Sequence, residues 1–275
     1  MAQRTSSNEF THIVLTRFNV AIGYASAGKG IESSWLEERL ALFMQYCFPT
    51  VSRQQGVAHR WVVLCNALSP EWFKEKMASL AGLTPVYVSG VATDEIIAQK
   101  VRETGLVTTP YLITTRIDND DSLSRSHLYF VQRAFLRQQR EFLVFPIGLQ
   151  SFRGHLYQTY WPDNPFLSLI EKVRDDGSFT TVFCVPHTDV HTAGKVRRLW
   201  HSPQWLQVIH GNNVGNTLQA WPRIRSRAHP NFDLAWPQDV PADTFPQRAN
   251  FALTQVRNRA LRVLGRLKAR AVGGA

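Results

Sequence analysis

The sequence predicts an α/β fold in which a mixed sheet is flanked by helices. In the first half, short apolar runs rich in β-branched residues alternate four times with segments that carry or permit a helix. That alternation is typical of parallel strands covered on both faces. In the second half, strand-like runs follow one another, so antiparallel strands are expected there. With 44% hydrophobic and 19% charged residues in 275, the chain can bury a large core and is not disordered.

The elements of the first half follow from periodicity and local signals. Trp35, Leu36, Leu40 and Phe43 recur at helical spacing, and Pro49 is expected to end that helix. We predict strands at 12–16, 61–65, 84–88 and 112–117, and helices at 35–46, 71–82 and 94–103.

The second half is predicted with less alternation. A helix is expected at 126–139, a short helix or turn carrying Glu171 at 166–173, and strands at 141–149, 154–161, 179–185 and 205–210. Residues 221–246 are rich in proline and tryptophan and predict an irregular cover. We therefore expect one domain over 1–246, with its ligand-binding halves at about 10–125 and 126–220, and a separate tail at 247–275.

The charge of the chain indicates an anionic partner. The formal net charge is +10, and the tail is basic, with Arg259, Arg262, Arg266 and Arg270 along one edge of an apolar helical stripe. A basic amphipathic helix is typical of binding to an anionic membrane surface. The same stripe could instead dock on the body of the protein. Nucleic acid is not the expected partner, because no nucleic-acid motif accompanies the arginines.

Compartment signals are consistent with a cytoplasmic protein that can associate with the inner face of the membrane. The three cysteines, Cys47, Cys65 and Cys184, form neither a disulfide framework nor a zinc pattern, which favours a reducing compartment. The N-terminal residues have no apolar signal region, and no apolar run approaches the length of a membrane span.

The segment 112–121 is the strongest candidate for a functional site. A buried strand ends in Asp118, Asp120 and Asp121, and carboxylates this close repel one another unless a cation relieves the repulsion. A divalent cation bound through oxygen atoms would do so, and the carboxyl end of a strand is where open α/β sheets bind ligands. The alternative is an acidic turn before a helix that Ser122 or Ser124 caps.

Histidines late in the chain are further metal candidates. His210 ends an apolar strand, so it could complete a metal site or be a neutral histidine bonded to a carbonyl. His187, Asp189 and His191 alternate, so in a strand they would share a face, as a metal site or as an exposed polar edge.

Several segments together resemble the bacterial rhamnosyltransferase family of GT-A nucleotide-sugar glycosyltransferases. The resembling segments are HIVLTRFN (12–19), RWVVL (60–64), LITTRIDNDDS (112–122), NPFLSLIE (164–171) and QVIHGNN (207–213). The resemblance implies a GT-A-like fold, a nucleotide-sugar donor and Mn²⁺ or Mg²⁺. It places the metal at Asp120, Asp121 and His210. It implies donor contacts at Thr16, Arg17, Asn19, Arg116, Asp118 and Asn119, with Asp118 facing the nucleoside and the arginines facing phosphate.

An inverting transfer also needs a general base for the acceptor hydroxyl. Glu171 is the first candidate, because it follows the apolar run in the acceptor half, and Asp189 and Asp163 are the others. The expected function is metal-dependent transfer of a sugar, rhamnose by the family label, to a glycan or lipid-linked acceptor in surface polysaccharide synthesis. The alternatives are a polyanion- or membrane-binding protein without activity, and a metal-dependent phosphoester hydrolase.

Overall fold

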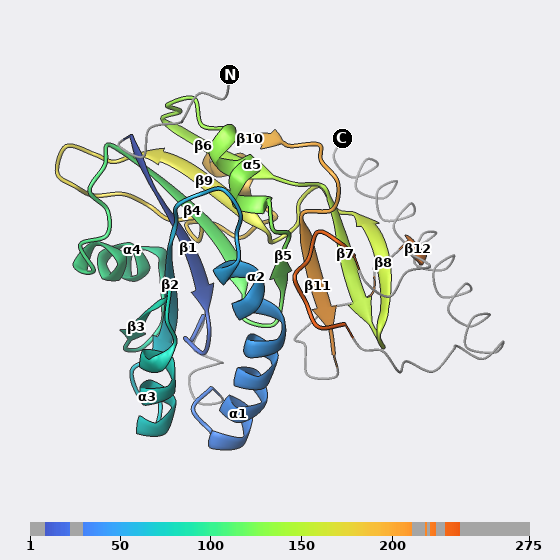
Figure 1. Ribbon diagram of the computed structural model, residues 1–275. Helices are drawn as coiled ribbons and strands as arrows, with labels where there is room; N and C mark the ends of the chain where they lie inside the picture. The colour runs from blue at the N-terminus through green and yellow to red at the C-terminus, as the bar shows by residue number, and fades with distance from the viewer. Residues whose placement is uncertain (1–8, 23–29, 211–217, 219–220, 224–228, 237–275) are drawn as a thin grey trace, which may run out of the picture.

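A mixed sheet forms the centre of the computed structural model, which describes residues 9–22, 30–210, 218, 221–223 and 229–236 (Figure 1). Its strand order in this part of the chain is β10-β6-β9-β4-β1-β2-β3. The four predicted strands of the first half are confirmed and run parallel: β1 (Phe10–Arg17), β2 (Arg60–Asn66), β3 (Thr84–Val88) and β4 (Tyr111–Asp118). The predicted fold class, a mixed sheet flanked by helices, is therefore confirmed.

The second half of the chain completes this sheet. The added strands are β6 (Arg140–Val144), β9 (Leu167–Lys172) and β10 (Lys195–Arg198), and β9 lies antiparallel between β4 and β6. The short helix or turn predicted at 166–173 is therefore wrong. An apolar run buried on both faces carries no alternation, so its periodicity does not separate strand from helix.

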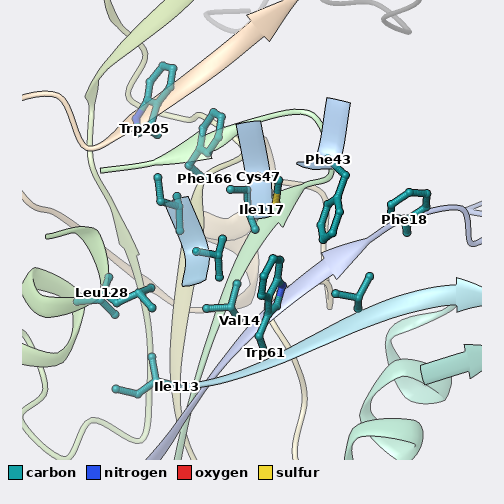
Figure 2. Packing of buried hydrophobic residues seen from close by; sticks show 14 of the residues in the cluster. Val14, Phe18, Phe43, Cys47, Trp61, Ile113, Ile117, Leu128, Phe166 and Trp205 are labelled. Atoms are coloured by element: carbon teal, nitrogen blue, oxygen red, sulfur yellow. The ribbon is translucent and has the colours of Figure 1, made fainter. Parts of the chain in front are cut away.

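Helices cover both faces of the sheet, as predicted. One face packs against α1 (Ser33–Leu42), η2 (Phe43–Cys47), α2 (Phe48–Ser52), α3 (Glu71–Ser79) and α5 (His127–Arg133). Figure 2 shows that face, where Phe43 and Trp61 pack with ring centroids 5.5 Å apart. The other face packs against α4 (Asp94–Glu103) and α6 (Val190–Ala193).

Two helix ends differ from the predictions. Pro49 does not end the first helix, because the wider turn of η2 precedes it and the chain continues helical to Ser52. The helix predicted at 126–139 ends at Arg133, and Arg137 soon after adopts the left-handed backbone conformation, with φ of 58°.

A second sheet lies beside the first, in the order β12-β8-β7-β11-β5 (Figure 1). Its strands are β5 (Ser122–Leu123), β7 (Ile147–Phe152), β8 (His155–Tyr160), β11 (Trp205–Ile209) and β12 (Trp221–Arg223). The strand predicted at 141–149 is thus two strands in different sheets, which Pro146 separates. The antiparallel pair of β7 and β8 and the strand at β11 are confirmed.

Trp205 of β11 joins the two sheets. Its ring stacks on Phe166 with centroids 4.6 Å apart, and its Nε1–H donates to the Phe145 carbonyl at 2.7 Å. The indole is fully buried (Figure 2). The seam between the sheets is therefore packed and hydrogen-bonded.

The predicted strand at 179–185 is wrong, because this segment forms turns on one face of the sheet. Its Val182 N–H donates to Thr114 Oγ1 at 2.9 Å, so the backbone is bonded to a side chain of β4 and not to a neighbouring strand. The tail at 247–275 and most of the irregular cover lie outside the described residues. Within the described part of the chain, no helix combines the length and hydropathy needed to cross a membrane.

Candidate active site

The candidate site lies at the carboxyl ends of β1 and β4. These strands are parallel neighbours, and their register sets Arg17 beside Asp118. The chain then turns through Asn119, Asp120 and Asp121 into β5. The predicted acidic segment therefore stands at an edge where two strands deliver charged side chains together.

Asp118 is held between two arginines. Its carboxylate lies 3.6 Å from an Nη atom of Arg17 and 3.6 Å from one of Arg116. Both guanidinium groups also lie over the ring of Phe183, at 4.5 and 5.3 Å from its centroid. Burial acts to raise the pKa of Asp118, but Arg116 and Arg17 outweigh it and leave that pKa below its ordinary value. Asp118 is therefore ionised, and its side chain is still 38% exposed.

Asp120 joins the loop after β4 to two distant elements. Its Oδ2 accepts from Nη1 of Arg39 on α1 at 2.7 Å and lies 2.9 Å from Nε2 of His210, which follows β11. Carboxylate and imidazole are both ligands for Mn²⁺, and Mg²⁺ is commonly held by one or two carboxylates together with substrate phosphates. The pair fits such an ion in residue type. Among the described residues, however, no group of three or more histidine, cysteine or acidic side chains is placed to hold a metal.

Asp121 is turned inward. Its Oδ1 accepts the backbone N–H of Val208 at 2.8 Å, which fixes β11 to the acidic loop. Burial, and then the nearby Asp120 and Asp118, raise the pKa of Asp121 well above its ordinary value. Its position favours a structural role and leaves Asp120 as the better placed of the two predicted metal ligands.

Three of the residues predicted to contact the donor form hydrogen bonds within the fold instead. Thr16 Oγ1 accepts from Trp61 Nε1 at 3.0 Å, and Asn119 donates to the Phe18 carbonyl at 2.8 Å. Asn19 donates to the Gly30 carbonyl at 2.7 Å and accepts the Asn66 N–H at 2.9 Å. Because these groups are buried and bonded, the structure does not bring their side chains to the exposed edge beside Asp118.

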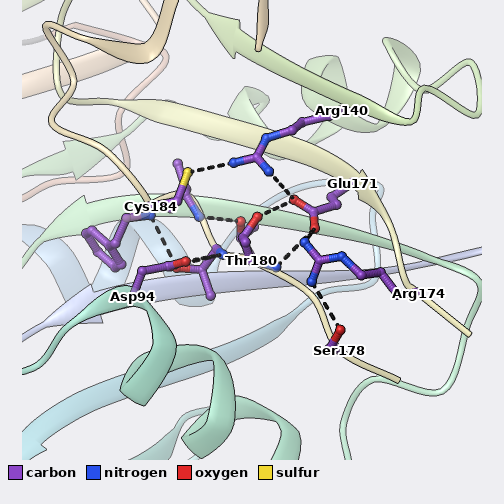
Figure 3. Close-up of polar contacts among 11 residues, drawn as sticks. Asp94, Arg140, Glu171, Arg174, Ser178, Thr180 and Cys184 are labelled. Atoms are coloured by element: carbon purple, nitrogen blue, oxygen red, sulfur yellow. Dashed lines mark hydrogen bonds and ion pairs between the residues drawn. The ribbon is translucent and has the colours of Figure 1, made fainter. Parts of the chain in front are cut away.

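Glu171, the first candidate for the base, lies away from this edge. It pairs in register with Leu112 at the start of β4, about 20 Å along the strand from Asp118. Figure 3 shows its carboxylate between Arg140 and Arg174, at 3.8 and 3.5 Å, with Thr180 also donating to it. The prediction that Glu171 acts as base is therefore not supported, since its geometry is that of a structural ion pair.

The other two predicted acids differ in their surroundings. Asp163 forms a 3.2 Å ion pair with Arg198, and Asp189 is exposed just before α6. His187 is half-buried, its ring centroid 5.9 Å from that of Trp161. Burial lowers the pKa of His187, as do Arg116 and Arg17, while Asp118 and Asp163 act in the opposite direction. Residues 187–191 form a turn and α6 and not a strand, so the shared face expected for His187, Asp189 and His191 does not exist.

Sequence reasoning missed two contributors, Arg39 and Phe183. Arg39 reaches Asp120 from a helix 81 residues earlier in the chain, and Phe183 belongs to a segment that was predicted as a strand. Neither carries a motif. Only the tertiary arrangement shows that they belong to this site.

A family model described as "Putative rhamnosyl transferase" matches residues 25–221. The chain belongs to this family. The matched range includes the acidic loop, Arg39, His187 and His210, and the family supports the predicted enzyme class, a glycosyltransferase. No match was found among curated proteins.

Solved structures were also matched, all at low sequence identity. Residues 1–349 of TarS from S. aureus match with 8% identity and a TM-score of 0.42, covering 73% of this chain and 60% of that one. The same TarS fragment in complex with UDP-GlcNAc matches with 10% identity and a TM-score of 0.39, covering 74% and 60%. The inositol-1-phosphate CTP transferase from T. maritima matches with 11% identity and a TM-score of 0.35, covering 73% and 89%. The chain thus spans about three fifths of the TarS fragment.

Proposed function

We propose that this protein is a metal-dependent glycosyltransferase that moves a sugar, rhamnose by its family, from a nucleotide-sugar donor to a glycan or lipid-linked acceptor in surface polysaccharide synthesis. The proposal rests on the charged side chains at the carboxyl ends of β1 and β4, in a protein that belongs to this family. There an ionised aspartate between two arginines lies beside an aspartate–histidine pair.

In this proposal, different residues bind the nucleoside, the diphosphate and the metal of the donor complex. Asp118 accepts hydrogen bonds from the ribose or base, because its lowered pKa keeps it ionised. Arg17 and Arg116, stacked on Phe183, present guanidinium groups to the diphosphate. Asp120 and His210 would hold Mn²⁺ or Mg²⁺, which when bound stabilises the negative charge of the leaving diphosphate.

For the acceptor side we propose Asp189 as the general base. It is an exposed carboxylate two residues after His187, and the charge of Asp118 acts on the pKa of that histidine. Asp189→Asn should lower kcat by about 10²-fold or more and leave donor affinity unchanged. A variant that retains the wild-type kcat would exclude this role.

The proposal includes the cellular location of the protein, for which the basic charge of the tail is one argument. We propose that the protein acts in the cytoplasm, at the inner face of the membrane, and that the basic tail at 247–275 contacts the anionic surface.

A thermal-shift panel tests the donor site. UDP-, dTDP- and GDP-sugars are added with and without Mn²⁺, since a ligand that binds only the folded state stabilises it by about 2.7 kcal/mol at a hundredfold excess over Kd. We expect one donor to raise Tm in the presence of Mn²⁺ and Asp120→Ala to abolish that rise. Asp175→Ala, an exposed acid in the loop after β9, is the matched control and should respond like wild type. Equal nucleotide affinity with and without Mn²⁺ would contradict metal dependence.

A further inference from the structure

Two exposed aromatic side chains are stacked on one another beside the candidate site. Tyr160 ends β8 and Trp200 follows β10, and their rings lie 5.9 Å apart between centroids and 12° from parallel. Tyr160 is 58% exposed and Trp200 is 62% exposed. Large rings left in water on a folded protein commonly mark a binding surface.

The topology places this pair at the same edge of the main sheet as the acids. β10 is parallel to β6, while β9 is antiparallel to both β6 and β4, so β4, β6 and β10 end at one edge. β10 stands three strand positions from β4, which is about 14 Å across the sheet. A short oligosaccharide can span that distance.

Polar and aromatic residues adjoin the stacked pair in the sequence. Next to the pair, Arg198 and Asp163 form their ion pair at 3.2 Å, with both side chains about half exposed. The Trp161 and His187 rings lie 5.9 Å apart between centroids, and the charges of Asp118 and Asp163 both act on the pKa of His187. His187 is therefore influenced both by the donor-side aspartate and by Asp163, the partner of Arg198 next to the stacked rings.

We propose that Tyr160 and Trp200 form a stacking subsite for a pyranose unit of the acceptor glycan, with Arg198 and Asp163 bonding its hydroxyls. The proposal rests on the proposed function, since it names where the acceptor lies. One face of a pyranose carries C–H groups that pack on the electron-rich face of an aromatic ring. A lipid chain or a protein partner would favour a wider apolar surface than two rings provide.

The test follows the indole N–H signal of Trp200 in protein labelled with [¹⁵N]tryptophan. The signal is assigned by its loss in Trp200→Phe. The probes are neutral trisaccharides of glucose, N-acetylglucosamine or rhamnose, added at millimolar concentration without any nucleotide. We expect at least one of them to shift the Trp200 signal, and Tyr160→Ala to raise the Kd of that probe about tenfold. Tyr129→Ala, which removes an exposed aromatic ring on α5, is the matched control and should leave that Kd unchanged.

The outcomes separate this subsite from the proposed function. If no trisaccharide shifts the Trp200 signal while a sugar nucleotide still binds, the subsite is wrong and the donor site stands. If the signal changes only with protein concentration, the rings contact a second copy and the subsite is likewise wrong. A shift that Tyr160→Ala weakens supports the subsite even if the nucleotide experiment fails.

Discussion

Glu171 is a buried carboxylate whose described contacts join parts of the fold. Its side chain is 5% exposed, and it accepts from the Thr180 N–H at 3.0 Å while lying between Arg140 and Arg174 (Figure 3). These contacts join β9 to β6 and to the loop that follows β9. Removing the negative charge would leave two arginines without their shared partner.

Glu171→Gln should therefore lower the free energy of unfolding by about 1–3 kcal/mol, the cost of leaving charged hydrogen-bonding groups unpaired. Urea denaturation measures the loss. Sugar-nucleotide affinity at a temperature where the variant is folded should equal that of wild type. A variant of full stability that had lost transfer would instead make Glu171 a catalytic residue.

At the scale of single residues, the sequence predicted the acids but not their surroundings. Asp118 and Asp120 follow a recognisable strand, so their place at its carboxyl end could be inferred. Thr16 and Asn19 stand in the same kind of position, yet their side chains bond within the fold. Sequence position gives the edge of a sheet, whereas the direction and partners of a side chain depend on tertiary packing.

Among the elements, the Trp205 ring of β11 packs directly against Gly148 of β7. A Cβ atom added to Gly148 on β7 would lie 2.1 Å from Cε2 of Trp205. Because that indole is buried against Phe166 and bonded to the Phe145 carbonyl, it has little room to move. Glycine is therefore needed at position 148, because any side chain there would collide with the Trp205 ring.

Gly148→Ala should destabilise the protein by about 1–3 kcal/mol or more through overpacking of the seam. Gly194→Ala is the control, because its backbone is extended and its added Cβ would lie 3.3 Å from the nearest atom, on Phe142. Differential scanning calorimetry of both variants measures the difference. Equal Tm values would show that Trp205 relaxes at no cost.

The prediction of elements succeeded where local pattern and tertiary setting agree. The strands β1 to β4 are apolar and separated by long connections, so they were found. The segment 179–185 is equally apolar, but it packs on the sheet face and bonds to the Thr114 side chain. Burial alone produces the same composition in a strand and in a covering turn.

For the whole molecule, two buried histidines make stability depend on pH. Burial lowers the pKa of His127 to about 4 from 6.5, and it lowers that of His12 well below 6.5. His127 lies 3.0 Å from the Gln204 carbonyl through Nδ1, while its Nε2 has no hydrogen-bonding partner among the described residues. The folded state therefore holds this ring neutral.

The unfolded chain binds these protons at higher pH than the folded protein. Stability should thus be unaffected above pH 6.5 and fall as the pH drops toward about 4, by about 3 kcal/mol from His127. His127→Asn should flatten this slope, and His191→Asn, an exposed histidine on α6, should not. Urea unfolding between pH 7 and pH 4 measures the slope, and an unchanged slope in His127→Asn would contradict the assignment.

The hydrogen bonds between the acidic loop and the β11 segment have a consequence for ligand binding. The Val208 amide holds Asp121, and His210, two residues further along, holds Asp120. Val208 lies in β11 and His210 directly follows this strand, whose seam with the main sheet is packed. These bonds hold the acidic loop in place before a donor binds. Donor binding should therefore cost little conformational entropy of the loop.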